Sequence, residues 1–382
     1  MTLRIPPRPP PPPPPPPARP AAEKVAKKAA SPVPPRPVAP KVTASKAAPV
    51  SPKAKAPPVA PKAAVDAKAA PAAPQAVVET QAAPASSLAA TEASLAPQAR
   101  AVAGASNVSV SKDSRFSSDF KTWLQDNGYG DYSFAKGDVP SFGGRSQPGE
   151  KLTQQPVIFI HGNSDSAAGW KKSIEGFADQ GYKPSEMYAM TWGDQSPLLA
   201  SQQHHSRKNE EEVRAFIQAV KEYTGAEKVD VIGHSMGVTL ARKAIQGGDG
   251  FDPYPGGGKY DLGAPLTQSV DAFVGIAGAN HGLASAAFTG NLVPTTNRET
   301  GLHPFSNILR DINATPHDEG SHVYSIWSHV DEILGVGIAG TTGPIPGQDG
   351  QKVYSTFPFG HMGSRDLSVD TQVSMVRDHV VR

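Results

Sequence analysis

Short apolar runs alternate with helical patterns from about residue 155 onward, and this rhythm limits the fold more than any other feature. The expected strands cover residues 156–160, 186–191, 228–232, 270–276 and 323–327. The expected helices cover residues 170–180, 209–224, 236–246 and 371–381. Strands that alternate with helices predict an α/β fold, with a mostly parallel central sheet and helices on both faces. In such sheets, reactive side chains gather beyond the carboxyl ends of the strands.

The first 110 residues do not share this rhythm. They hold 26 of the 40 prolines and no Phe, Tyr or Trp, and the first aromatic residue of the chain is Phe116. With so little apolar surface to bury, residues 1–110 are expected to remain a disordered Pro/Ala/Lys-rich segment. Residues 111–382 are then long enough for one large domain.

Charge divides the chain at the same place, with +10 in residues 1–110 and −8 in residues 111–382. The basic residues of the first segment are scattered, which favours a solvated spacer with at most transient contact with a lipid interface or the cell envelope. We expect no nucleic-acid partner. The sequence has no transmembrane segment, and no signal peptide is recognised, because residues 1–5 run straight into proline. It has no cysteine, so disulfides and thiolate sites are excluded.

The segment Gly233-His234-Ser235-Met236-Gly237 matches the Gly-x-Ser-x-Gly pattern. A β-branched strand leads into it and a helical pattern leads out, so the serine would stand on a tight strand-to-helix turn. Small residues are needed there because side chains would strike the neighbouring backbone. The helix that follows directs its positive end toward the site. We predict that Ser235 is a nucleophile; the alternative is an ordinary serine in a βα turn.

A serine nucleophile needs a base and an acid that orients the base, in the chain order Ser, Asp or Glu, His. The histidines after Ser235 are His281, His303, His317, His322, His329 and His361. His361 is the preferred base, because it lies on a glycine-flanked loop that could reach across the strand ends. Asp331 directly follows the strand expected at 323–327 and is the preferred acid, with Glu332 as the fallback.

The oxyanion that forms during such a reaction needs two backbone N–H donors. One is expected from Met236, the residue after the nucleophile. The second is expected from Asn163, in the loop that follows the strand at 156–160, where Gly162 would let the chain pass close to the substrate. His161 in the same loop is interpreted as structural.

Together these residues resemble the class 2 lipases, a family of bacterial-type triacylglycerol lipases and esterases in the α/β-hydrolase superfamily. The matching stretches are PVIFIHGNSD at 156–165, TWGD at 191–194, YTGA at 223–226, VDVIGHSMGVT at 229–239 and GIAGAN at 275–280. The resemblance implies hydrolysis of carboxylic esters through an acyl-enzyme, with Ser235, Asp331 and His361 as the triad. It also favours a secreted or envelope-associated protein.

Other functions remain open at this point. The same motifs are similar to those of extracellular polyhydroxyalkanoate depolymerases, and a triad alone does not exclude an acyltransferase. A non-catalytic binding protein on this fold is the alternative from another class. We predict a monomer without cofactor or metal, since His204-His205 is not helically spaced and residues 249–252 lack the alternating carboxylates of a calcium loop. The long segments 247–266 and 279–320 are expected to be loops.

Overall fold

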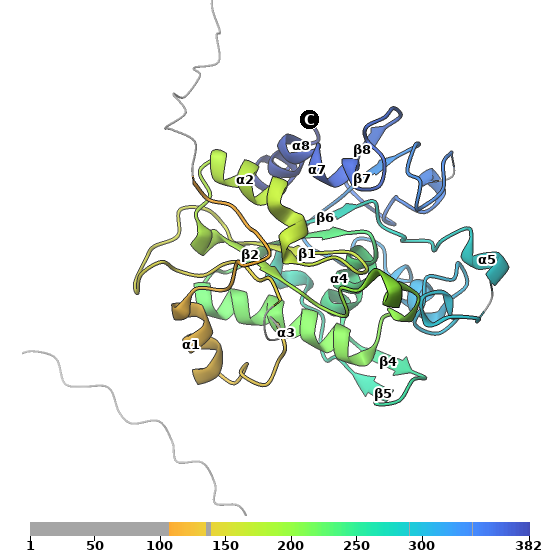
Figure 1. Ribbon diagram of the computed structural model, residues 1–382, viewed down its shortest axis with the longest axis horizontal. Helices are drawn as coiled ribbons and strands as arrows, with labels where there is room; N and C mark the ends of the chain where they lie inside the picture. The colour runs from red at the N-terminus through yellow and green to blue at the C-terminus, as the bar shows by residue number, and fades with distance from the viewer. Residues whose placement is uncertain (1–106, 135–138, 290, 338) are drawn as a thin grey trace, which may run out of the picture. The chain divides into compact units, whose positions relative to one another are not determined.

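The computed structural model describes residues 107–134, 139–289, 291–337 and 339–382 (Figure 1). The predicted N-terminal segment 1–110 therefore lies outside the described residues, apart from its last four positions. No helix in the described ranges combines the length and the apolar character that crossing a membrane requires.

A six-stranded sheet of order β2-β1-β3-β6-β7-β8 forms the centre of the domain, and every neighbouring pair of strands is parallel. The strands are β1 (Val157–Ile160), β2 (Met187–Met190), β3 (Val229–His234), β6 (Val270–Ile276), β7 (His322–Ser328) and β8 (Gly350–Tyr354). All carboxyl ends consequently meet at one edge of the sheet. The predicted α/β fold with a mostly parallel sheet is confirmed.

Helices cover both faces of this sheet (Figure 1). Helices α2 and α8 lie together on one face, whereas α3 lies on the other and packs against α4. The α-helices are α1 (Ser118–Asp126), α2 (Lys171–Asp179), α3 (Arg207–Thr224), α4 (Met236–Gln246), α5 (Ala286–Thr289), α6 (Asn307–Ile312), α7 (Gly363–Asp366) and α8 (Val369–Val373). The 3₁₀-helices are η1 (Ala167–Trp170), η2 (Pro184–Glu186), η3 (Pro197–Gln202), η4 (Thr267–Ser269), η5 (Pro294–Thr296) and η6 (Ala339–Thr341).

Local sequence explains where the longest helix begins and ends. The Ser206 side chain accepts the N–H of Asn209 and so caps the amino end of α3. At the other end, Gly225 takes a left-handed conformation with φ 69°, which glycine adopts without steric cost. The apolar runs form the central strands because these strands are buried on both faces, and all four residues of β1 are fully buried.

The structure departs from the predicted elements at several places. The segment 279–320, expected to be a loop, contains the short helices α5, η5 and α6, and the helix α1 was not expected. The closing helix expected at 371–381 is α8 followed by a π-helical turn, η7 (Ser374–Asp378), and it ends at the left-handed residue His379. The segment 247–266 is not a plain loop, because it contains the antiparallel pair β4 (Asp249–Asp252) and β5 (Gly258–Asp261). The edge strand β8 was not expected; its residues are only partly buried and so lack a continuous apolar run.

Candidate active site

Ser235 stands between β3 and α4, at the carboxyl edge of the sheet. Its backbone has φ 55° and ψ −129°, a combination that a residue with a Cβ rarely adopts. Strained backbone of this kind persists where the surrounding structure enforces it, and it is concentrated at functional sites. The serine is half-buried, so its hydroxyl remains accessible on a sharp strand-to-helix turn.

Glycine is required on both sides of this turn. A Cβ at Gly233 would lie 2.8 Å from the Cα of Val238, and a Cβ at Gly237 would lie 2.2 Å from the carbonyl oxygen of His161. Both obstacles are backbone atoms, which cannot rotate away. The glycines therefore allow α4 to begin directly behind the serine and against the end of β1.

His361 and Asp331 are in direct contact. The Nδ1–H of His361 donates to Asp331, with Nδ1 at 2.9 Å from Oδ2 and 3.1 Å from Oδ1. Asp331 is fully buried and His361 is 5% exposed. The carboxylate also accepts the backbone N–H groups of Ile333 and Leu334, which hold it in place. A proton held on Nδ1 leaves the lone pair of the imidazole on Nε2, the tautomer that a general base needs.

Glu332, the fallback acid, has a different partner. Its Oε2 accepts the backbone N–H of His361 at 3.0 Å, so the carboxylate holds the loop rather than the ring. Both acids thus accept a hydrogen bond from His361, but of the two only Asp331 accepts one from the imidazole ring.

His361 contacts His234, the residue that precedes Ser235. The Nε2–H of His234 donates to the carbonyl oxygen of His361 at 3.2 Å, and the two ring centroids are 4.8 Å apart. The Ser235 hydroxyl itself has no hydrogen-bond partner among the described residues. In ligand-free serine hydrolases the hydrogen bond between the serine hydroxyl and the histidine is often long, and it shortens when substrate binds.

The loop after β1 passes immediately beside the serine. A Cβ at Gly162 would lie 2.9 Å from the Cβ of Ser235. The following Asn163 is anchored through its side chain, whose Nδ2 donates to the carbonyl of Ala200 at 2.9 Å. In the described part of the chain, neither the backbone N–H of Asn163 nor that of Met236 donates to an acceptor. Both backbone N–H groups expected from the sequence are thus left unpaired near the Ser235 turn.

His161 has the structural role expected of it. Its Nδ1–H donates to the carbonyl of Gly162 at 2.7 Å, and its Nε2 accepts the backbone N–H of Trp192 at 3.0 Å. Burial lowers the pKa of His161 to about 4, so the ring stays neutral. With both nitrogens occupied, this imidazole fixes the shape of the loop.

Sequence reasoning did not assign a role to His234 or Arg365. Burial, and then the neighbouring His361 and Arg365, hold the pKa of His234 well below its usual range, so this ring is a neutral hydrogen-bond donor. Arg365 forms an ion pair with Asp165 at 2.6 Å and thereby ties α7 to the loop after β1. The position of His234 directly before Ser235 was the available signal for His234, whereas nothing in the sequence pointed to Arg365.

Several of the segments that leave this edge of the sheet carry exposed large apolar side chains. Nine of the fourteen exposed large apolar residues in the described ranges lie on segments that follow the carboxyl ends of β2, β6, β7 and β8. They are Leu198, Leu199, Phe288, Leu292, Phe305, Ile333, Val336, Phe357 and Met362. Exposed side chains of this kind offer apolar surface on the segments around the strand ends. We call these nine residues the apolar rim.

The parallel sheet, the strained serine between β3 and α4 and the glycines on either side of it define an α/β-hydrolase fold. A family model described as Lipase (class 2) matches residues 154–374, more than half of the chain. The chain belongs to the class 2 lipase family, as the sequence motifs predicted.

Solved structures with a similar fold include lipases and esterases. The mature form of Bacillus licheniformis lipase BlEst2 is 13% identical with a TM-score of 0.43, over 62% of this chain and 95% of that one. Aspergillus fumigatus lipase B is 16% identical with a TM-score of 0.39, over 57% of this chain and 52% of that one. MGS-MChE2, an α/β hydrolase from a lagoon-sediment metagenome of Mar Chica, Morocco, is 14% identical with a TM-score of 0.34, over 60% of this chain and 91% of that one.

Proposed function

We propose that this chain hydrolyses carboxylic esters through an acyl-enzyme on Ser235. The observation that carries the proposal is the buried Asp331–His361 pair, which lies against the residue preceding a strained serine. An imidazole held by a carboxylate and able to reach a serine hydroxyl is the arrangement that activates serine for attack on a carbonyl carbon. Membership of the class 2 lipase family supports an ester as the substrate.

The contacts of Asp331 and His361 support the following roles. His361 Nε2 takes the proton of the Ser235 hydroxyl as its oxygen attacks the ester carbonyl, and Asp331 stabilises the imidazolium that results. The backbone N–H groups of Asn163 and Met236 stabilise the oxyanion of the tetrahedral intermediate. The intermediate then expels the alcohol, which receives the proton from His361. A water molecule, deprotonated by the same imidazole, releases the acid and restores the serine.

The apolar rim favours a substrate with a long apolar part. Its side chains belong to segments that follow the ends of β2, β6, β7 and β8, and we expect an acyl chain that leaves the site to meet apolar surface there. Lipid esters and aliphatic polyesters both have this character, whereas short polar esters would gain little from it. We therefore propose apolar esters as the substrate class, with lipids ahead of polyesters.

We further propose that residues 111–382 are the whole catalytic unit. Every residue assigned a role above lies within this range, and the family match lies inside it as well. A variant that lacks residues 1–110 should keep its activity on soluble esters within about twofold. A large loss would show that the N-terminal segment contributes to the site.

The experiment that tests the proposal compares wild type with Ser235→Ala. Removing a serine nucleophile lowers kcat by up to about 10⁶-fold. The assay is a series of p-nitrophenyl esters from acetate to palmitate, with tributyrin emulsion and polyhydroxybutyrate film beside it, and an alcohol acceptor added to detect acyl transfer. Ser118→Ala, at an exposed position on α1, is the matched control and should keep full activity. If Ser235→Ala keeps a tenth of the wild-type rate, the nucleophile is elsewhere.

A further inference from the structure

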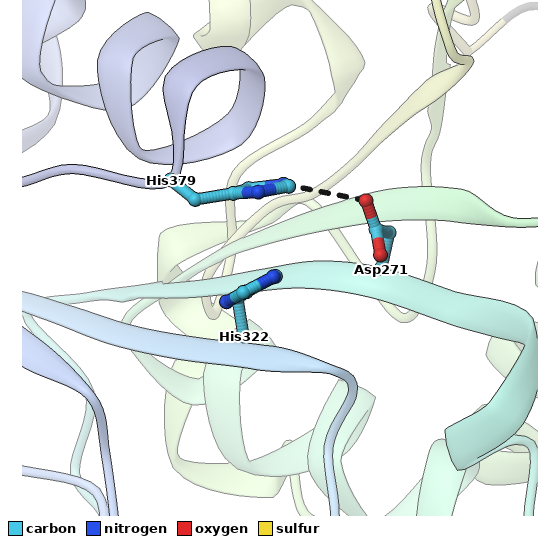
Figure 2. A group of neighbouring side chains, drawn as sticks. All are labelled: Asp271, His322 and His379. Carbon is cyan, nitrogen blue, oxygen red and sulfur yellow. Dashed lines mark ion pairs between the residues drawn. The ribbon is translucent and has the colours of Figure 1, made fainter.

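A second group of chemically active side chains lies at the opposite edge of the sheet from Ser235. Asp271 is near the amino end of β6, His322 is the first residue of β7, and His379 follows η7. Figure 2 shows the three side chains converging from these separate elements. One oxygen of Asp271 and one nitrogen of each histidine all lie within 4.8 Å of one another.

His379 is held in position by its backbone. It has φ 55° and ψ 37°, a left-handed conformation that is uncommon for a residue with a Cβ. Its carbonyl oxygen accepts the hydroxyl of Tyr324 at 2.9 Å, and the N–H of the next residue, Val380, donates to Ser374. This held conformation places the Nε2 of His379 at 3.3 Å from Oδ2 of Asp271.

The second imidazole is left without a hydrogen bond. The rings of His322 and His379 stack with centroids 3.9 Å apart, yet neither ring nitrogen of His322 has a hydrogen-bond partner among the described residues. A half-buried imidazole normally uses at least one of its nitrogens. Here a free lone pair faces a carboxylate and a second imidazole, an arrangement that a shared cation would complete.

Lys228 is the competing positive charge at this place. Its Nζ lies 3.2 Å from Oδ1 of Asp271 and 2.6 Å from the hydroxyl of Ser321. Lys228 therefore pairs with Oδ1 of Asp271, whereas His379 faces Oδ2. The Oδ2 side of the carboxylate, where the weak 3.4 Å contact with Gln155 Nε2 also lies, is left for a further ligand.

We propose that Asp271, His322 and His379 bind one divalent transition-metal ion of the zinc type. Two imidazole nitrogens and one carboxylate oxygen form a donor set that Zn²⁺ prefers, with water as the fourth ligand. Ligand atoms around tetrahedral Zn²⁺ stand about 3.4 Å apart at bond lengths near 2.05 Å. The His379–Asp271 distance already matches this separation, and the other ligand atoms, which lie within 4.8 Å of one another, would move closer as the metal binds.

The role of this metal is structural. It would join the segment after η7 to two central strands, and it lies at the amino edge of the sheet, whereas the nucleophile is at the carboxyl edge. The metal should stabilise the fold without entering the reaction. This inference is independent of the proposed function, since the two sites share no residue.

The test uses the full chain, stripped of metal with a chelator and then dialysed against ZnCl₂. We expect one zinc per chain by plasma mass spectrometry. His322→Asn and His379→Asn should each weaken binding at least about 100-fold, since loss of a ligand is felt strongly in such sites. Asparagine is chosen at position 379 because it tolerates positive φ. His204→Asn is the matched control, since His204 also pairs with an aspartate, Asp252, at 3.4 Å but has no second imidazole in its cluster.

Thermal unfolding provides the second measurement. At a hundredfold excess of Zn²⁺ over its Kd, the Tm of wild type should rise by about 5 °C, and the two asparagine variants should lose this rise. Circular dichroism establishes that each variant is folded, and His322→Asn alone decides the result if His379→Asn does not fold. Less than 0.2 zinc per wild-type chain, or equal affinity in wild type and His322→Asn, would overturn the proposal.

Discussion

Replacing Asp331 by asparagine should reverse the tautomer of His361. In wild type, Oδ1 of Asp331 accepts two backbone N–H groups, at 2.9 and 2.8 Å, and Oδ2 faces Nδ1 of His361 at 2.9 Å. An asparagine oxygen can keep the two backbone contacts, so the NH₂ group then points at the imidazole. Because NH₂ donates, Nδ1 must accept, and the ring proton moves to Nε2. The imidazole can then no longer take a proton from the serine.

The expected loss is a factor of about 10³–10⁴ in kcat for Asp331→Asn, as wrong-tautomer substitutions cause in other triads. This corresponds to about 4–5.5 kcal/mol of transition-state stabilisation. Glu332→Gln is the matched control, because a glutamine oxygen can still accept the backbone N–H that Glu332 now accepts at 3.0 Å. Its kcat should fall by less than about tenfold, the effect of weakening one hydrogen bond.

The assay is steady-state hydrolysis of p-nitrophenyl butyrate by the purified full chain, with kcat and KM determined separately. Thermal unfolding of each variant verifies that the loss is not a loss of folded protein. Two results would refute the reasoning. One is an Asp331→Asn variant with more than a tenth of wild-type kcat, and the other is a larger loss in Glu332→Gln than in Asp331→Asn.

Three further predictions follow from contacts near the site and in the core. In Gly162→Ala, the new Cβ would lie 2.9 Å from the Cβ of Ser235, so the loop must shift; we expect kcat to fall by about 10–100-fold with little change in KM, measured on the same ester. His234→Leu removes the N–H that holds the His361 carbonyl and should lower kcat by about 5–30-fold, whereas an unchanged kcat would remove His234 from the positioning groups. Burial raises the pKa of Glu210 to about 8, so the native protein keeps a proton that the unfolded chain loses above its ordinary value of 4.5. The free energy of unfolding therefore falls as pH rises from about 4.5 to about 8. Urea unfolding should show that the free energy of unfolding of Glu210→Gln rises by about 3 kcal/mol relative to wild type between pH 5 and 8. The same pH dependence in both proteins would contradict this explanation.

The parts of the fold that could be predicted from the sequence are those set by local pattern. The strand β3, the glycines around Ser235 and the helix α4 are contiguous in the chain, so one short segment specified the serine turn. The contact between Asp331 and His361 was predictable because Asp331 comes soon after an expected late strand and His361 lies on a glycine-flanked loop later in the chain, the order this fold requires.

The remaining features depend on contacts between distant segments. The pair β4–β5 lies in a glycine- and proline-rich stretch, and β8 is a partly exposed edge strand, so neither has the apolar run that indicates a buried strand. The cluster of Asp271, His322 and His379 escapes any spacing rule, since its members are 51 or more residues apart and meet only when β6, β7 and η7 pack together.

The central claim is that the Ser235 hydroxyl attacks the carbonyl carbon of an ester. A p-nitrophenyl alkylphosphonate mimics that ester and remains attached to the oxygen that attacks it. Intact mass spectrometry should show one phosphonyl group per chain, peptide mapping should place it on Ser235, and esterase activity should disappear in proportion to labelling. Two results would contradict the claim: a label on any other residue, or full esterase activity in protein whose Ser235 carries the phosphonyl group.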